Sequence, residues 1–398
     1  MRLIGFWTAG ALSLAFCLLI EPQNSSSAQM SAPGCPTRWI CPADPILSPK
    51  TRIGAWYAAF YQAPGRPFAV HWSYTRYMPI DGYYASGDPA AVRSQFAQMR
   101  AVGIEYAVLD DTNGIENDEG QIEKNVRSIF DTNESLPENK RLRLAFALGI
   151  WNPKVWHVNG AAALLPHVQE EADHVYDAYA SRPSYFTWKG RPLLVEYGPY
   201  NSGDVPDALR RWSDPRFTIR HSTYRAEVAN PLLQQYADEG LWGWFLPEPQ
   251  LASPETIAVS PGYNRKHIIP TASTIERDDG QHYMRHWLFA IKHRPENIVV
   301  ASWNDFSEET QVAPSKNVRA TPYVDSYGEE TTDWYAQITS AYAHLRTGLM
   351  PGVYYGEENS AAFFKVVDGK LVRQSSMPHG HPVIRLPAGA LEGLPGNS

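Results

Sequence analysis

The chain has 398 residues, of which 43% are hydrophobic and 19% are charged, and its 28 Gly and 32 Pro are spread without any low-complexity block. This composition excludes a disordered, collagen-like or coiled-coil protein. The formal charge of −7 argues against a broad nucleic-acid-binding surface.

The N-terminus is typical of a targeting segment. An apolar run extends from Leu3 to Ile20, and the small residues Ser26 and Ala28 suit cleavage by a signal peptidase. We therefore expect a signal peptide over residues 1–28 and a secreted or periplasmic protein. The run is close to the length of an uncleaved membrane anchor, which is the alternative. No later stretch of the sequence is apolar enough to span a bilayer.

A proline-rich arm is predicted over residues 29–51, because this stretch has no hydrophobic periodicity. It holds Cys35 and Cys41, an even pair once the signal peptide and its Cys17 have left. In an oxidising compartment we expect these two cysteines to form a disulfide.

From residue 52 onward, short apolar runs alternate with helical patterns. The first predicted helix has Asp88 as its N-cap and Pro89 in its first turn, and it stops before Gly103. Such alternation predicts a (β/α)8 TIM barrel over residues 52–347. An open doubly wound sheet is the alternative, but no glycine-rich phosphate loop follows the first strand. The eight predicted strands are 53–58, 106–109, 142–148, 192–195, 217–219, 240–245, 256–259 and 297–302.

The remaining residues, 348–398, are predicted to form a small C-terminal appendage. Two short β-type runs flank Asp368 and Gly369. An Asp-Gly pair between such runs is a strong signal for a tight hairpin turn.

Acidic residues recur where the predicted strands end. Asp110 and Asp111 follow the second strand, Glu196 follows the fourth, and Glu248 and Asp305 follow later ones. The carboxyl-terminal ends of barrel strands carry the active sites of this architecture. Two carboxyl groups with different pKa values are what glycoside hydrolysis requires. Some of these acids could equally be helix caps or partners of arginine.

The most informative segment runs from Trp303 through Asn304, Asp305, Phe306 and Ser307 to Glu308. It resembles the last-strand motif of two glycoside hydrolase families. In family 99 that motif reads roughly W-N-E-W-x-E-G-T-Q-I-E-P, and in family 71 roughly W-N-D-Y-G-E-S. Weaker similarities in residues 81–89, 190–195 and 259–263 occur in the same order as in the family 99 relatives.

This resemblance implies a TIM barrel whose catalytic carboxyl groups are Asp305 and Glu308. Glu308 would be the general acid, and Asp305 the base that activates water or the 2-hydroxyl of the sugar. The sequence departs from the family 99 pattern at Asp305 in place of Glu, at Glu309 in place of Gly and at Ala313 in place of Glu.

Further residues near the strand ends are candidates for binding the sugar. Aromatic rings offer flat apolar faces on which pyranose C–H groups stack, and carboxylates or amides bind hydroxyl groups. No metal-binding motif is present in the sequence, so we expect no metal and no other cofactor. The candidate substrate-binding residues are Trp56, Tyr57, Asp111, Trp151, Glu196, Tyr197, Trp244, Glu248, Trp303 and Asn304.

Taken together, the sequence predicts an exported glycoside hydrolase that cleaves an α-linked polysaccharide or glycan of the glucan or mannan type. The alternative is a non-catalytic carbohydrate-binding or polysaccharide-assembly protein on the same barrel, in which Asp305 and Glu308 are structural. The expected partner is a polysaccharide or oligosaccharide and not a nucleic acid, and the oligomeric state is left open.

Overall fold

The structure is a computed structural model, and it describes most of the chain beyond the N-terminal segment. Cys41 is disulfide-bonded, but its predicted partner Cys35 and the predicted signal peptide lie outside the described residues. The described residues are 36–67, 69–73, 75–114, 117–149, 161–197, 212–223, 242–243, 255–317 and 332–397. None of the helices in these ranges is both long and apolar enough to cross a membrane.

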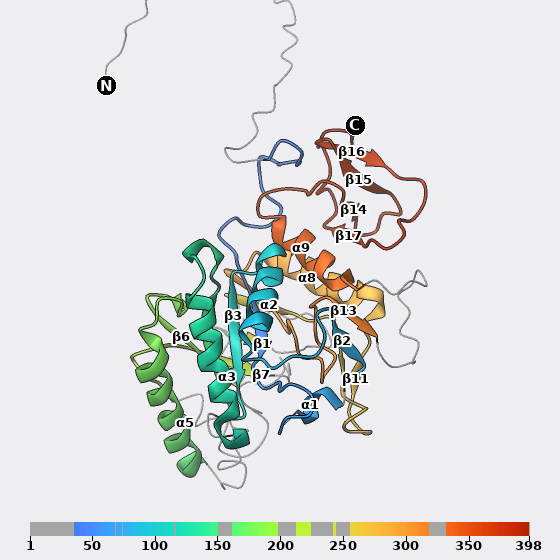
Figure 1. The fold of residues 1–398 in the computed structure, drawn as a ribbon. Helices are drawn as coiled ribbons and strands as arrows, with labels where there is room; N and C mark the ends of the chain where they lie inside the picture. The colour runs from blue at the N-terminus through green and yellow to red at the C-terminus, as the bar shows by residue number, and fades with distance from the viewer. Residues whose placement is uncertain are drawn as a thin grey trace, which may run out of the picture. The chain divides into compact units, whose positions relative to one another are not determined.

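A curled parallel sheet forms the centre of the fold (Figure 1). Its strands run in the order β8-β7-β6-β4-β3-β1-β12-β9 in the described ranges, and all neighbouring pairs along this path are parallel. The last strand of the series, β12, pairs with the first, β1, through Gly54 opposite Val299. The chain thus returns to its starting strand, as the predicted barrel requires. The strands are β1 (Arg52–Ala58), β3 (Tyr106–Asp111), β4 (Arg143–Gly149), β6 (Arg191–Tyr197), β7 (Thr218–Thr223), β8 (Trp242–Gly243), β9 (Thr256–Val259) and β12 (Asn297–Val300).

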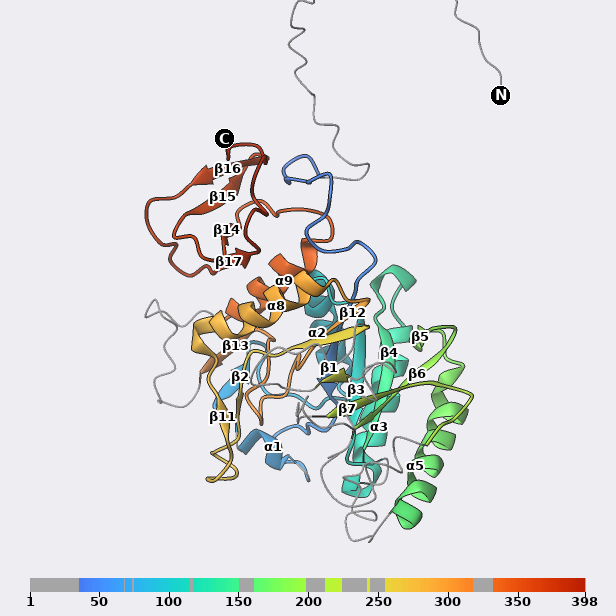
Figure 2. The same cartoon turned by 180° about the vertical axis from the view of Figure 1, so that it is seen from behind.

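Helices cover the outer face of this sheet, where α3 packs on β3, α5 packs on β4, and α2 lies beside α3 (Figure 2). The first of them begins as expected, because the Asp88 side chain accepts hydrogen bonds from the backbone N–H groups of Ala90 and Ala91. The described residues include the helices α1 (Val70–Ser73), α2 (Pro89–Ala101), α3 (Asn117–Glu134), α5 (Ala161–Val175) with a π-helical turn at Tyr176–Ala180, α8 (Gln281–His293) and α9 (Trp334–His344).

Several short strands escape prediction because each is only two or three residues long. β5 (Thr187–Trp188) extends the main sheet by an antiparallel pair with β6. The remainder form two small antiparallel pairs, β2 (Tyr77–Pro79) with β13 (Ser315–Asn317) and β10 (Tyr263–Asn264) with β11 (Thr274–Ile275).

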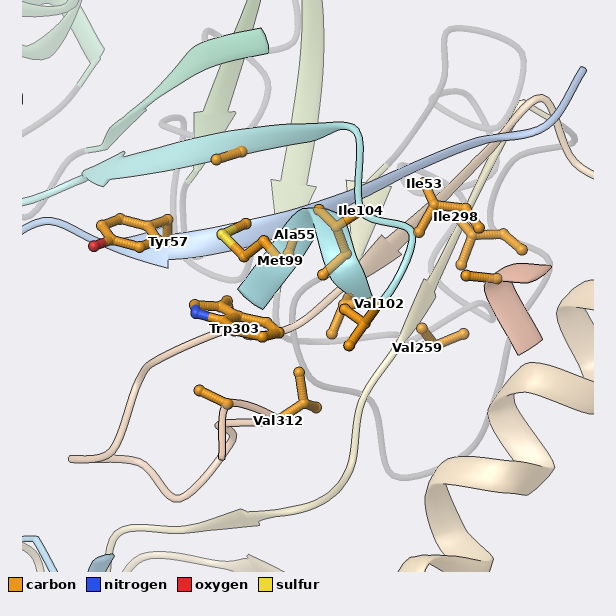
Figure 3. Packing of buried hydrophobic residues seen from close by; sticks show 14 of the residues in the cluster. Ile53, Ala55, Tyr57, Met99, Val102, Ile104, Val259, Ile298, Trp303 and Val312 are labelled. Carbon is orange, nitrogen blue, oxygen red and sulfur yellow. The ribbon is translucent and has the colours of Figure 1, made fainter. Parts of the chain in front are cut away.

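Side-chain alternation along the strands divides the core into two clusters. On β1, Trp56 points into the sheet's inner face, where it joins Tyr106 and Val108 of β3. Ile53, Ala55 and Tyr57 belong to the outer cluster, under α2 (Figure 3). Full burial of an aliphatic side chain such as that of Ile53 contributes about 1.5–3 kcal/mol to the free energy of unfolding.

Gly54 shows how tightly the inner cluster is packed. A Cβ atom at this position would lie 2.2 Å from the ring of Tyr106. That ring stacks on Phe186 with 4.3 Å between the centroids. Any side chain at Gly54 would therefore displace a stacked aromatic pair from the interior of the sheet.

The C-terminal residues form a four-stranded sheet and not only a hairpin. Val367 pairs with Lys370 across Asp368 and Gly369, both of which have positive φ values of 47° and 72°, as a type I′ turn requires. Tyr342 of α9 donates a hydrogen bond of 2.7 Å to a carbonyl of this sheet. The appendage is thus tied to the helical layer. Its strands follow the order β16 (Lys370–Arg373), β15 (Phe363–Val367), β14 (Tyr354–Glu357) and β17 (Val383–Leu386).

Candidate active site

The turn that follows β12 holds the carboxyl group of Asp305 in place. One carboxylate oxygen, Oδ1, accepts hydrogen bonds from the Ser307 hydroxyl at 2.7 Å, the Ser307 backbone N–H at 3.0 Å and the Glu308 backbone N–H at 3.1 Å. Asp305 is 4% exposed. A buried carboxylate with three donors on one oxygen has a fixed direction, and its charge is partly compensated.

Asn304 and Tyr61 fasten this turn to the segment that follows β1. The Asn304 amide accepts from the backbone N–H of Ala58 at 2.7 Å and donates to the Tyr84 hydroxyl at 2.9 Å. The Tyr61 hydroxyl accepts from the backbone N–H groups of Phe306 and Ser307 at 2.9 and 3.0 Å. Residues 302–308 are thus positioned by the first strand of the sheet.

Glu308 lies at the edge of this turn beside a cation. Its carboxylate is 3.1 Å from a guanidinium nitrogen of Arg265, and the two side chains are 16% and 39% exposed. The Glu308 carbonyl accepts from the backbone N–H of Asn264, at 2.9 Å. The β10 segment therefore brings Arg265 to the last-strand motif, although nothing in the sequence marks this arginine.

Asp110 is the inward-facing residue at the end of β3, and the charge of Asp305 affects its pKa. The pKa of Asp110 is raised to about 6, because burial and the charge of Asp305 raise it by more than the hydrogen bonds from Thr112 lower it. Burial also raises the pKa of Asp305, against the Ser307 and Glu308 donors and the Arg265 cation, which lower it. Ionisation of Asp305 makes ionisation of Asp110 less favourable, as is common for neighbouring acids in active sites.

Glu309 is a structural anion next to this site. It is 1% exposed and forms a two-pronged ion pair with Arg76, and its backbone carbonyl accepts from Arg277 at 3.1 Å. Its φ of 54° lies in the left-handed region that favours glycine. Glycine would adopt this conformation without strain, whereas Glu309 adopts it against the usual preference of a residue with a side chain.

Three of the predicted substrate-binding residues have side chains that are fully buried and held by other protein groups, and their contact with a sugar stays a prediction. Tyr57 is fully buried on the outer face of β1 and packs on Phe96 of α2. Trp303 is fully buried and donates to Gln95 of α2 at 2.7 Å. The side-chain amide of Asn304 is hydrogen-bonded to Ala58 and Tyr84.

Two of the predicted acids face away from the inner side of the sheet. Asp111 points toward the outer layer, where burial and the charges of Glu171 and Glu123 raise its pKa. Glu196, 1% exposed, alternates with the inward-facing Val195 and pairs with His221 at 3.2 Å. Asp110 is the inward acid that the prediction should have preferred, because alternation places it on the same face as Tyr106 and Val108.

Trp56 and Tyr197 lie together on the inner side, with 6.1 Å between their ring centroids. Both stay predictions as sugar-binding residues. Trp151, Trp244 and Glu248 lie outside the described residues. Within the ranges that are described, no group of three or more His, Cys, Asp or Glu side chains is arranged to hold a metal ion.

No protein-family model matches this sequence, and no curated protein does. Two solved structures of the glycoside hydrolase family 99 endo-α-mannosidase from Bacteroides thetaiotaomicron are similar to it. One is 17% identical with a TM-score of 0.55, over 74% of this chain and 97% of that chain. The other, in complex with bis-tris-propane, is 18% identical with a TM-score of 0.56, over 75% of this chain and 98% of that chain. The predicted resemblance to family 99 is confirmed at the level of the fold.

Proposed function

We propose that the protein is a glycoside hydrolase that cleaves an α-linked glycan of the mannan or glucan type. The observation that carries the proposal is the turn at residues 302–308, which fixes one buried carboxylate, Asp305, beside a second, more accessible carboxyl group, Glu308. The turn lies at the carboxyl-terminal end of a parallel sheet, where barrel enzymes have their active sites. The likeness to an endo-α-mannosidase favours mannan as the first substrate to test.

In the proposed reaction, Asp305 is the base and Glu308 is the general acid. Burial raises the pKa of Asp305, and hydrogen bonds and the Arg265 cation limit that rise. In its ionised form Asp305 takes a proton from water or from the sugar's 2-hydroxyl. When the substrate enters, Glu308 leaves Arg265 and takes up a proton from solvent, and it then donates that proton to the glycosidic oxygen of the leaving group. Tyr197, which is half-buried and packs against the fully buried Trp56, is the aromatic side chain that we propose contacts the sugar.

A non-catalytic carbohydrate-binding protein is the second candidate function, favoured by the ion pair between Glu308 and Arg265. A carboxylate held permanently in such a pair would have no proton to donate. Reducing-end release from a panel of α-mannans and α-glucans, followed by analysis of the product anomer, distinguishes the two candidates. Binding to a glycan of the panel without any release of reducing ends would replace the hydrolase by the binding protein.

The proposal includes a closed barrel. β8 and β9, the two ends of the hydrogen-bonded path, are consecutive in the chain and lie close together. Closure between them would complete the (β/α)8 topology and leave no sheet edge unpaired. An experimental structure with β8 and β9 separated would contradict it.

We further propose that the protein is exported and that Cys41 pairs with Cys35. The disulfide-bonded state of Cys41 and the apolar run at the N-terminus support this. Mass spectrometry of secreted material, with and without reductant, should find residues 1–28 missing and one disulfide present. A full-length chain with free thiols would contradict both parts.

A further inference from the structure

The opposite rim of the sheet, at the amino-terminal ends of the strands, carries a pocket. Its volume is about 690 Å³, within the range of small-molecule sites. It opens where β1, β3 and β4 begin and where α9 has ended, at the other end of the strands from Asp305 and Glu308. Its charged lining consists of Arg52, Arg100, Arg141, Arg143, Arg346 and a single acid, Glu105.

Among the described residues, two of these five guanidinium groups have a carboxylate partner. Glu105 is shared between Arg52, at 2.8 Å, and Arg346. Arg346 also donates to the carbonyls of Thr51 and Gly103, which fixes it at the pocket wall.

In the described ranges, the partners of the other three arginines are main-chain carbonyls. Arg141 reaches Leu136 at 2.7 Å, Arg143 reaches Pro183 at 2.6 Å, and Arg100 reaches the carbonyl of Lys140. None of the three has a carboxylate within ion-pair distance in the part of the chain that the structure describes. Each keeps guanidinium N–H groups that these carbonyls do not occupy, because a guanidinium has five.

This concentration of positive charge stands out in a chain whose formal charge is −7. Like charges brought together repel one another, and partial burial lowers the pKa of Arg100, which adds to the cost. A bound anion would relieve that repulsion. Guanidinium groups match phosphate and carboxylate oxygens with paired hydrogen bonds.

We propose that this pocket binds a phosphate-bearing anion, either a free compound or the headgroup of an anionic lipid. Phosphate is favoured over carboxylate because it carries more negative charge in a smaller group. That charge would lie opposite three guanidinium groups that have no carboxylate partner among the described residues. The site lies away from the proposed catalytic turn, so its occupancy does not depend on the hydrolase proposal.

Isothermal titration calorimetry with pyrophosphate at low salt tests the proposal. We expect one site per chain, with an affinity that falls as salt is added. The double variant Arg141→Gln/Arg143→Gln should weaken binding by at least about tenfold, because two charge-assisted contacts are lost. The matched control, Arg93→Gln/Arg373→Gln, removes the same charge from exposed positions outside the pocket and should bind as the parent protein does.

Arg100→Gln serves as the second variant if the double variant does not fold by circular dichroism, since it breaks only a contact to the Lys140 carbonyl. Cosedimentation with vesicles of phosphatidylglycerol in phosphatidylcholine, lost in the same variants, would assign the headgroup, and pyrophosphate binding without cosedimentation would assign a free compound. The proposal is overturned if the parent protein binds neither probe, if the pocket variants bind as well as the control, or if citrate binds as tightly as pyrophosphate.

Discussion

At the carboxyl-terminal rim of the sheet, Asp305 and Glu309 are at most 4% exposed, and each is held by several donors. At the amino-terminal rim, Arg141 and Arg143 are more accessible and reach only main-chain carbonyls. The carboxylates at the first rim are held by a cation or by several N–H and O–H donors. Arg141 and Arg143 at the second rim have main-chain carbonyls, and no carboxylate, as partners among the described residues.

This difference separates charges on which the fold depends from charges that a ligand can use. A buried ion that loses its partner destabilises the folded protein strongly, whereas an exposed charge can be removed at little cost. We therefore expect substitutions at the two rims to differ in kind, with stability and catalysis affected at one and ligand binding at the other.

The largest effect is expected from Arg76→Gln, which leaves Glu309 buried with His267, 3.6 Å away, as its nearest basic side chain. Loss of one partner of a buried ion pair should lower the free energy of unfolding by about 3–5 kcal/mol. Urea unfolding measures it, with Arg127→Gln as the control because that arginine is 58% exposed in its ion pair. Equal effects of the two substitutions would show that the Glu309 pair is not a structural requirement.

Asp110→Asn should stabilise the protein at neutral pH. Because the folded-state pKa is about 6 against an ordinary 3.8, the Asp110 contribution is fully present below pH 3.8 and is lost as the pH rises through 6. Asparagine carries no charge, so the variant should gain up to about 3 kcal/mol over the parent protein above that pH. Thermal unfolding from acidic to neutral pH tests this, with the exposed Asp44→Asn as control. If the pH dependence of stability were the same in the variant and the parent protein, the raised pKa of Asp110 would be contradicted.

Glu308→Gln keeps the shape of the side chain and removes its proton. Hydrolysis of the natural glycan should fall by at least about 10²-fold, and a substrate with an activated leaving group should lose less. Asp305→Asn should harm both substrates alike, since base assistance is needed for each. Glu392→Gln, in the C-terminal appendage, is the control. Full activity in a folded Glu308→Gln variant would remove Glu308 as the general acid.

Arg265→Gln should move the acidic limb of the pH–rate profile. The Arg265 cation lowers the pKa of Asp305, so its removal raises that pKa and delays ionisation of the base. The rate should therefore rise at a higher pH in the variant, by up to about one pH unit. Lys266→Gln, the neighbouring exposed cation, should leave the limb in place. An equal shift of the acidic limb in both variants would mean that overall surface charge, and not the Arg265 cation in particular, sets the pKa of Asp305.

The smallest effect is expected at the amino-terminal rim. Arg143→Gln removes an exposed charge with a carbonyl partner, so the free energy of unfolding should change by less than about 1 kcal/mol. A loss as large as that of Arg76→Gln, measured in the same urea series, would erase the distinction between the rims.

Local patterns in the sequence were sufficient for the strand and helix order and for the last-strand motif. Apolar runs such as residues 106–109 and the cap at Asp88 depend on near neighbours in the chain, and both occur where they were predicted. The Asp-Gly turn at residues 368–369 depends on positive φ angles that these residue types adopt readily. These features need no distant contact to form.

The direction of each side chain at the rims was decided only by the tertiary structure. Adjacent acids, Asp110 and Asp111, lie on opposite faces of β3, and the choice between them depends on which face the curled sheet turns inward. The pairing of Glu308 with Arg265 and of Glu309 with Arg76 joins residues 43 and 233 positions apart. The arginine pocket likewise gathers residues from Arg52 to Arg346. Such groupings follow from the packing of strands onto one another, because parallel strands bring all their like ends to one rim whatever their separation in the sequence.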